Sequence, residues 1–148
     1  MHKIQKSAIL PYAAEKIFQL VNDIEKYPDF LPWCREAVIL TQDTHTVQAR
    51  LLLSKGGMEK SFTTVNSLTP STRMIMELVD GPFKHLKGIW DFQVLSDHEC
   101  QVALDLEFEF SSKLVAMLFG PVFQQAAHKL VDAFVDRADE LYGHTPKN

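Results

Sequence analysis

The chain has 148 residues, a net charge of -4 and 46 % hydrophobic residues, which is typical of a globular protein. This length fits one domain, residues 1–148, burying roughly 70 % of its unfolded surface. The acidic balance argues against sequence-independent nucleic-acid binding, and no DNA partner is expected. The longest apolar run, residues 114–119, is far shorter than the roughly 20 residues of a membrane span. With no leader peptide expected before the first strand, a cytoplasmic protein is predicted.

The first expected elements are a strand over residues 4–10 and two short helices. Pro11 has a backbone angle suited to a helix start, and apolar residues recur at helical spacing from 14 to 21. Asn22-Asp23 interrupts this helix. A second helical turn is expected over 24–30.

The region from Trp33 to Phe110 predicts strands, because its apolar residues alternate with polar ones. Lys55-Gly56-Gly57 is typical of a hairpin turn. Asp105, Glu107 and Glu109 alternate with apolar residues, as in an antiparallel sheet with one solvated face. The expected strands span 35–40, 45–53, 58–68, 72–79, a segment after Gly81-Pro82 that ends before Ser96-Asp97, and 100–110.

From Lys113 to Tyr142 the apolar period becomes helical, after a pair of good capping residues at Ser111-Ser112. Gly120-Pro121 predicts a kink or a break in this helix. Gly143 and Pro146 end it, and residues 144–148 are expected to be frayed. The expected fold is α+β: a curved six- to seven-stranded antiparallel sheet wrapped around one long C-terminal helix, with a core over about 3–143.

Gly88 lies among large apolar residues on one face of its strand, between Leu86 and Trp90. A glycine at such a position suits a bend or the close approach of another group. Together with the break at Gly120-Pro121, it predicts space between the sheet and the C-terminal helix.

Three segments, residues 27–34 (YPDFLPWC), 81–92 (GPFKHLKGIWDF) and 119–123 (FGPVF), are similar to signature segments of the coenzyme Q-binding START family. This family is a branch of the START-like helix-grip superfamily. The resemblance covers about residues 3–143. Ala13 departs from it, because many relatives have a capping serine there.

The resemblance implies a helix-grip fold that binds ubiquinone or another polyprenyl lipid and supports quinone-dependent respiration. It also implies an alternative, since bacterial members are described as ribosome-association toxins that bind the large ribosomal subunit and hinder subunit joining. A third class, the polyketide cyclase-like enzymes of the superfamily, would require a polar dyad in the pocket, and the sequence offers none.

A polyprenyl quinone is nearly all apolar, so its burial supplies most of its affinity. No cofactor is required besides this bound ligand. Each candidate residue taken alone also fits an ordinary core position, but the set predicts a pocket. The candidate ligand-binding residues are Phe30, Leu31, Trp33, Phe83, Leu86, Gly88, Trp90, Phe92, Leu104, Leu106, Phe108, Phe119, Phe123 and Leu130.

Two further hypotheses concern this set. The indole N–H of Trp33 or Trp90 is a candidate donor to a quinone carbonyl. Some of the set are predicted to form an apolar mouth, which would allow transient contact with a membrane surface and a peripheral location at the inner membrane. The alternative is that they fasten the short helices to the sheet. These mouth residues are Phe30, Leu31, Trp33, Phe83 and Phe119.

Nothing in the sequence predicts catalysis or a metal site, so a non-enzyme is expected. The six histidines lie on separate elements, and no nucleophile elbow or phosphate loop occurs. Arg50 and Arg73 fit exposed or ion-paired positions better than a ligand head-group site. Cys34 and Cys100 are expected to be buried, reduced thiols.

Ribosome binding would require a basic surface. Lys55 and Lys60 flank the Gly56-Gly57 turn, and Lys84 and Lys87 open the strand after Gly81-Pro82. These four lysines are the candidate ribosome-binding surface. Alternatively, they are solvent-exposed charges that prevent the edges of the sheet from pairing with other chains and aggregating.

Overall fold

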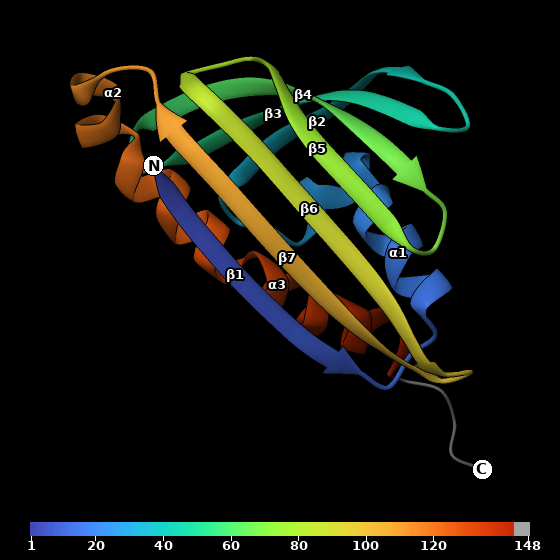
Figure 1. Ribbon diagram of the computed structural model, residues 1–148. Coiled ribbons are helices and arrows are strands. Elements are labelled where there is room, and N and C mark those ends of the chain that lie inside the picture. The colour runs from blue at the N-terminus through green and yellow to red at the C-terminus, as the bar shows by residue number, and fades with distance from the viewer. Residues whose placement is uncertain (144–148) are drawn as a thin grey trace.

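The computed structural model describes residues 1–143, so the frayed tail expected over 144–148 lies outside the described residues. A single antiparallel sheet of seven strands, in the order β1-β7-β6-β5-β4-β3-β2, makes up most of the fold (Figure 1). The strands are β1 (His2–Leu10), β2 (Cys34–Gln42), β3 (Thr46–Lys55), β4 (Met58–Thr69), β5 (Arg73–Asp80), β6 (Phe83–Ser96) and β7 (Glu99–Phe110).

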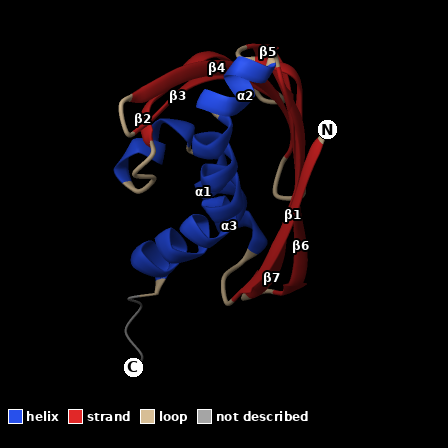
Figure 2. Cartoon of the chain, turned by 90° about the vertical axis from the view of Figure 1, so that its left-hand side faces the viewer, coloured by secondary structure: helices blue, strands red, loops and turns tan. Residues whose placement is uncertain are grey.

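The helices lie on the concave side of the curved sheet, and the longest of them runs across it (Figure 2). They are α1 (Ala14–Asn22), the 3-10 helix η1 (Ile24–Asp29), α2 (Lys113–Leu118) and α3 (Gly120–Tyr142). This arrangement confirms the predicted helix-grip fold.

The start of α1 differs from the prediction. Pro11 lies in a bend, and the helix begins at Ala14 with Ala13 in the extended conformation of an N-cap. Because Ala13 has no side-chain oxygen, no side-chain hydrogen bond caps α1.

The predicted break at Gly120-Pro121 separates α2 from α3. Phe119 lies between them, and Pro121 occupies the first turn of α3. The backbone N–H groups of a first helical turn have no partner within the helix, so proline's lack of an N–H breaks no hydrogen bond there. Ser112 caps α2, because its Oγ accepts a hydrogen bond of 3.1 Å from the amide of Val115. Even so, α2 buries none of its residues, and Leu114 is 59 % exposed.

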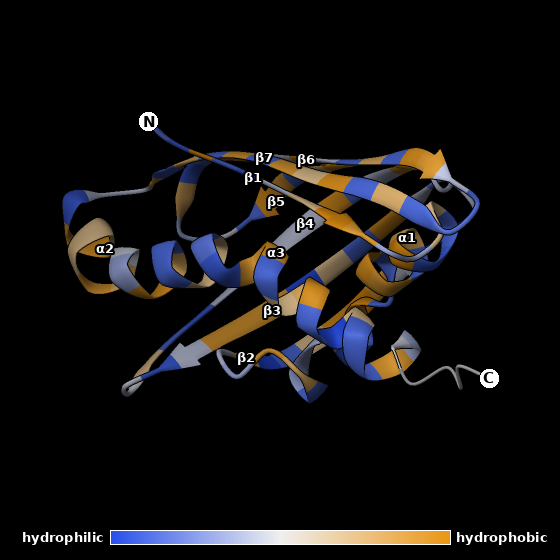
Figure 3. Cartoon of the chain, turned by 90° about the horizontal axis from the view of Figure 1, so that it is seen from below, coloured by the Kyte–Doolittle hydropathy of each residue, from blue (hydrophilic) through white to orange (hydrophobic). Residues whose placement is uncertain are grey.

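The core lies between the concave face of the sheet and α3. Hydrophobic and hydrophilic residues alternate along the strands (Figure 3), so that Leu86, Trp90 and Leu104 point inward and are at most 3 % exposed. The convex face carries the charges, among them Glu107, whose Oε1 lies 3.0 Å from Nε2 of His85. The predicted division into one buried and one solvated face is confirmed.

Between β3 and β4, Gly56 and Gly57 form the predicted hairpin turn with φ angles of +59° and +84°. Only glycine adopts two successive positive φ angles without a steric cost.

Candidate functional site: an apolar pocket under the C-terminal helix

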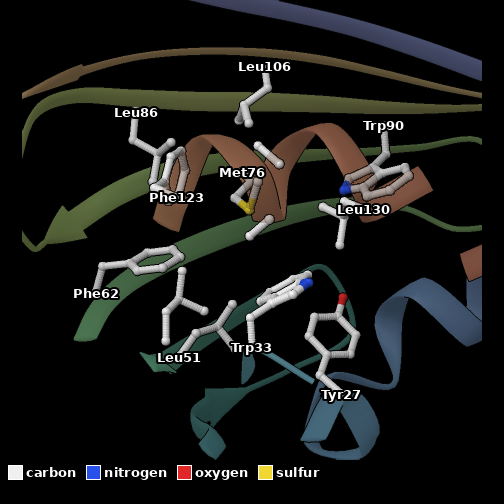
Figure 4. Close-up of a pocket in the computed structure, with 13 residues that line it drawn as sticks. Tyr27, Trp33, Leu51, Phe62, Met76, Leu86, Trp90, Leu106, Phe123 and Leu130 are labelled. Carbon is white, nitrogen blue, oxygen red and sulfur yellow. The ribbon is translucent and has the colours of Figure 1, made fainter. Parts of the chain in front are cut away.

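A cavity of about 70 Å³ lies between the sheet and α3 (Figure 4). Four groups of residues enclose it: the inward faces of the sheet strands, the middle of α3, η1, and the loop that follows η1. The lining residues are Tyr27, Trp33, Leu51, Leu53, Phe62, Met76, Leu86, Trp90, Leu106, Phe123, Ala126, Ala127 and Leu130.

The cavity exists because α3 presents small residues where it crosses the sheet. Ala126 and Ala127 are each 4 % exposed, so they pack in the interior, yet their side chains are too short to reach the opposite strands. Leu130 and Phe123, one turn to either side, extend farther and bound the space along the helix axis (Figure 4).

Six of the predicted ligand-binding residues line this cavity. They come from β6, β7, α3 and the η1–β2 loop, segments far apart in the sequence. They are Trp33, Leu86, Trp90, Leu106, Phe123 and Leu130.

The other predicted residues lie outside the lining. Most of them point into the same protein interior but away from the cavity along the sheet. There they pack against helix side chains, and no cavity remains between them. They are Phe30, Leu31, Phe83, Gly88, Phe92, Leu104, Phe108 and Phe119.

The gap expected at Gly88 is filled by a neighbouring side chain, so this glycine contributes to the cavity only indirectly. Gly88 is paired with Met76 across β5 and β6, and a Cβ built on Gly88 would lie 2.7 Å from Met76 Cε and 3.2 Å from Leu106 Cδ1. The group that closely approaches Gly88, as predicted, is therefore the side chain of Met76. Met76 lines the cavity, and residue 88 does not.

The predicted apolar mouth does not form. Leu31 and Phe119 are 0 % exposed. Phe119 and Phe83 belong to a buried aromatic cluster around Phe123. The ring centroid of Phe119 lies 5.9 Å from that of Phe123, and the ring centroid of Phe83 lies 4.9 Å from it. Phe30 is elsewhere, with its ring centroid 5.4 Å from that of Phe134 on α3. These residues fasten the short helices to the core, which was the alternative role.

Seven lining residues were not predicted as such: Tyr27, Leu51, Leu53, Phe62, Met76, Ala126 and Ala127. A signal existed for some of them. The alternation in β3 already placed Leu51 and Leu53 on the inward face, and Tyr27 opens the first signature segment. Met76 and the two alanines carried no such signal, because their position depends on strand register and on where α3 crosses the sheet.

The lining includes no aspartate, glutamate, histidine, lysine or arginine. Its one titratable group is Tyr27, whose hydroxyl donates a hydrogen bond to the carbonyl oxygen of Val21 on α1. Burial raises the pKa of Tyr27 above its ordinary value, with smaller contributions from Cys34 and Asp23. The described residues also hold no cluster of His, Cys, Asp or Glu suited to a metal ion.

The polar atoms of the pocket gather at one end. In Figure 4 the hydroxyl of Tyr27 and the indole nitrogens of Trp33 and Trp90 lie on the side away from Phe62 and Leu86. Trp33 also lines an outer groove between the η1–β2 loop and α3, which makes its ring the partition between cavity and surface. Across that groove Lys55 Nζ donates a hydrogen bond to Gln125 Oε1 on α3.

The four candidate lysines do not form one basic surface. Lys55 and Lys60 lie at the β3–β4 hairpin, beside α3 and α2 respectively. Lys84 and Lys87 lie on the convex face of β6, where Lys84 Nζ is 3.8 Å from Glu109 and Lys87 is paired in register with Glu107. The carboxylates on this face offset much of its positive charge.

The remaining candidates hold structural positions. Arg73 Nε donates a hydrogen bond of 2.8 Å to Asp91 on the convex face, and Arg50 is exposed. Cys34 and Cys100 are both free and buried, as predicted. Within residues 1–143, no helix has the length and hydropathy needed to cross a membrane.

The fold and the apolar pocket define a START-like helix-grip protein, and comparison with known families agrees. Residues 10–135 match the family described as polyketide cyclase / dehydrase and lipid transport. The chain belongs to this family.

Among curated proteins, the chain is 45 % identical over 140 residues to the ribosome association toxin RatA of Pseudomonas aeruginosa, covering 95 % of this chain and 97 % of that protein. It is 45 % identical over 142 residues to RatA of Escherichia coli K12, covering 96 % and 90 %. A more distant relative is the mitochondrial coenzyme Q-binding protein COQ10 homolog B of Xenopus laevis, 28 % identical over 93 % of this chain and 58 % of that protein.

Solved structures share the fold at low sequence identity. A START superfamily protein from Mycobacterium smegmatis superposes with a TM-score of 0.79 at 20 % identity, covering 95 % of this chain and 99 % of that one. The ZhuI aromatase/cyclase from Streptomyces sp. R1128 gives 0.81 at 16 % identity, covering 93 % of each chain.

Proposed function

We propose that the protein binds a small apolar molecule between its sheet and α3 and does not transform it. The observation that carries this proposal is a cavity whose lining is almost wholly aliphatic and aromatic, with no acid, base or nucleophile facing it. Such a lining favours burial of an apolar ligand. It also argues against a cyclase-type reaction, which needs a positioned proton donor or acceptor.

A polyprenyl quinone such as ubiquinone fits this chemistry, and the COQ10 relative is named for binding coenzyme Q. At about 70 Å³ the cavity is smaller than a substituted quinone ring, so binding requires side chains to move. Met76 and Leu130 are suited to this, because unbranched and γ-branched aliphatic side chains have alternative rotamers within reach. Trp33 separates the cavity from the outer groove and is the candidate gate.

The direct test is to purify the protein from cells under native conditions, extract it with organic solvent, and identify the extract by mass spectrometry. A quinone or another polyprenyl lipid in a constant ratio to protein is the expected result. The matched control is Ala127→Leu, which fills the cavity and should reduce the recovered lipid. Equal recovery from both proteins, or none from either, would count against the proposal.

We also propose a second function, association with the large ribosomal subunit, as a regulator of subunit joining. It is favoured by 45 % identity to proteins named ribosome association toxin RatA, over nearly the full length of both chains. This function would use the surface and leave the pocket free, so the two proposals are compatible. The Lys55–Lys60 hairpin is the favoured contact, because its one glutamate, Glu59, is ion-paired with Arg35, whereas on β6 Lys84 is ion-paired with Glu109 and Lys87 is in register with Glu107.

Co-sedimentation with purified large subunits over a salt series tests the second function. Binding through phosphates should weaken steeply as salt rises. The double variant Lys55→Glu/Lys60→Glu should abolish co-sedimentation, whereas its matched control Lys84→Glu/Lys87→Glu should retain most of it. Absence of co-sedimentation at low salt would remove this function, and equal loss in both variants would remove the assignment to the hairpin.

A further inference from the structure

Trp90 is a buried side chain whose indole N–H opens onto the cavity. Its side chain is 2 % exposed, packed between Phe92, with stacked rings 6.2 Å apart, and the edge-on ring of Phe134 at 5.5 Å. Figure 4 shows its indole nitrogen directed toward the cavity, and none of the described residues accepts a hydrogen bond from it. Because polar groups inside native proteins nearly always have a partner, an N–H that opens onto a cavity is available to a ligand or a water molecule.

Trp33 offers a second donor from the other side of the cavity. It belongs to the η1–β2 loop, whereas Trp90 belongs to β6, and within residues 1–143 its indole N–H likewise has no acceptor. The hydroxyl of Tyr27 already donates to Val21, so its oxygen is the one side-chain acceptor among the lining residues apart from the weak acceptor Met76.

We propose that this polar end of the pocket recognises carbonyl oxygens, and that the protein therefore binds an oxidised quinone in preference to the corresponding quinol. The inference rests on the proposed ligand-binding function and gives it a chemical selectivity. A para-quinone carries two carbonyl groups, and this end of the pocket offers two N–H donors, one from the η1–β2 loop and one from β6.

The preference for the oxidised form follows from the balance of donors and acceptors. Both carbonyl oxygens of a quinone accept from the indole N–H groups, so neither carbonyl is left unpaired. A quinol has two hydroxyl hydrogens to place, and Tyr27 offers one strong acceptor. At least one buried hydroxyl then loses its hydrogen bond to water without replacement, which corresponds to about a tenfold loss of affinity.

The test compares three probes of matched tail: decylubiquinone, decylubiquinol under anaerobic conditions, and decylbenzene, which has no hydrogen-bonding group. Dissociation constants of each are measured by calorimetry for the wild type, Trp90→Phe and Trp33→Phe. Phenylalanine keeps an aromatic ring and removes the N–H. Thermal unfolding identifies any variant that fails to fold, and Trp33, in a partly exposed loop, is the position where substitution is safer for folding.

The expected result is that the wild type binds the quinone about tenfold more tightly than the quinol, and that at least one folded variant loses this preference while its affinity for decylbenzene is unchanged. Equal affinity of the wild type for quinone and quinol would overturn the inference, as would a preference that survives in both variants. Binding of decylbenzene reports the apolar pocket itself. Decylbenzene binding without redox preference thus refutes the inference alone, and no binding of any probe refutes the proposed function as well.

Discussion

Met76 Cε occupies the space that a side chain at Gly88 would take, 2.7 Å from the position of the missing Cβ. The two residues are partners across β5 and β6, so the fit is fixed by the register of the sheet. The Met76 side chain lines the cavity, and its position therefore controls how much room a ligand has.

Gly88→Ala should push the methionine into the cavity. The added methyl group contacts the end of a flexible side chain, so the free energy of unfolding should fall by only about 1 kcal/mol, as for other mild overpacking changes. Ligand binding should fall far more, because the displaced thioether takes the ligand's place. Thermal unfolding and calorimetric titration with decylubiquinone measure the two effects. The double variant Gly88→Ala/Met76→Ala should restore binding, and failure to do so would contradict this role for Met76.

Ala127→Leu should fill the cavity from the side of α3. The larger side chain enters space that no other residue occupies, so the melting temperature should stay equal or rise, in line with cavity-filling gains of about 0.5–2 kcal/mol. Binding of apolar probes should be lost. Ala133→Leu is the matched control, since Ala133 lies on the same helix but lines the outer groove. A variant at 127 that binds as tightly as the wild type would show that ligands bind elsewhere.

Cys34 should be unreactive in the folded protein. Burial raises the pKa of its thiol from 9.0 to about 11, opposed in part by a hydrogen bond with the backbone of Glu36, and the pKa of Cys100 is also raised by burial. Alkylation by iodoacetamide at pH 8 should be slow in the folded state and fast in urea, because the thiolate is the reactive form. Mass spectrometry of labelled protein measures this, and rapid native labelling of Cys34 would contradict the assigned burial.

The same pKa shift predicts the direction of a stability change at high pH. The folded-state pKa lies above the unfolded value, so the unfolded state loses its proton first as the pH rises. The contribution of Cys34 to stability is complete below pH 9.0 and is lost as the pH passes through about 11. Cys34→Ala should show a smaller loss of stability across this window than the wild type in urea titrations.

Ala13→Ser should stabilise α1. The backbone at Ala13 already has the extended conformation of an N-cap, with φ -63° and ψ 143°, but no side-chain oxygen caps the helix. A serine Oγ there should accept a hydrogen bond from the first turn and raise the free energy of unfolding by about 1 kcal/mol. The reciprocal control is Ser112→Ala, which removes the existing cap of α2. Urea titration compares them, and no gain at position 13 would contradict the capping account.

The sequence by itself determined the order and type of the elements. The alternation in β3 and β7, the glycine turn at 56–57 and the break before Pro121 are local signals, read over a few residues and set by backbone sterics and burial on one face. The helix start at Pro11 was placed too early because proline favours both a first helical turn and the bend that precedes one.

Only the tertiary structure decided which of the apolar residues face a cavity. Phe83, Phe119 and Trp90 are equally apolar in sequence and all buried, yet two pack in an aromatic cluster and one turns its N–H to open space. That distinction depends on where α3 crosses the sheet and on which strand partners meet, as Met76 and Gly88 do. The hydrophobic effect is not directional, so a pattern of apolar residues predicts that one face of an element is buried. It does not predict how completely side chains fill the space against that face.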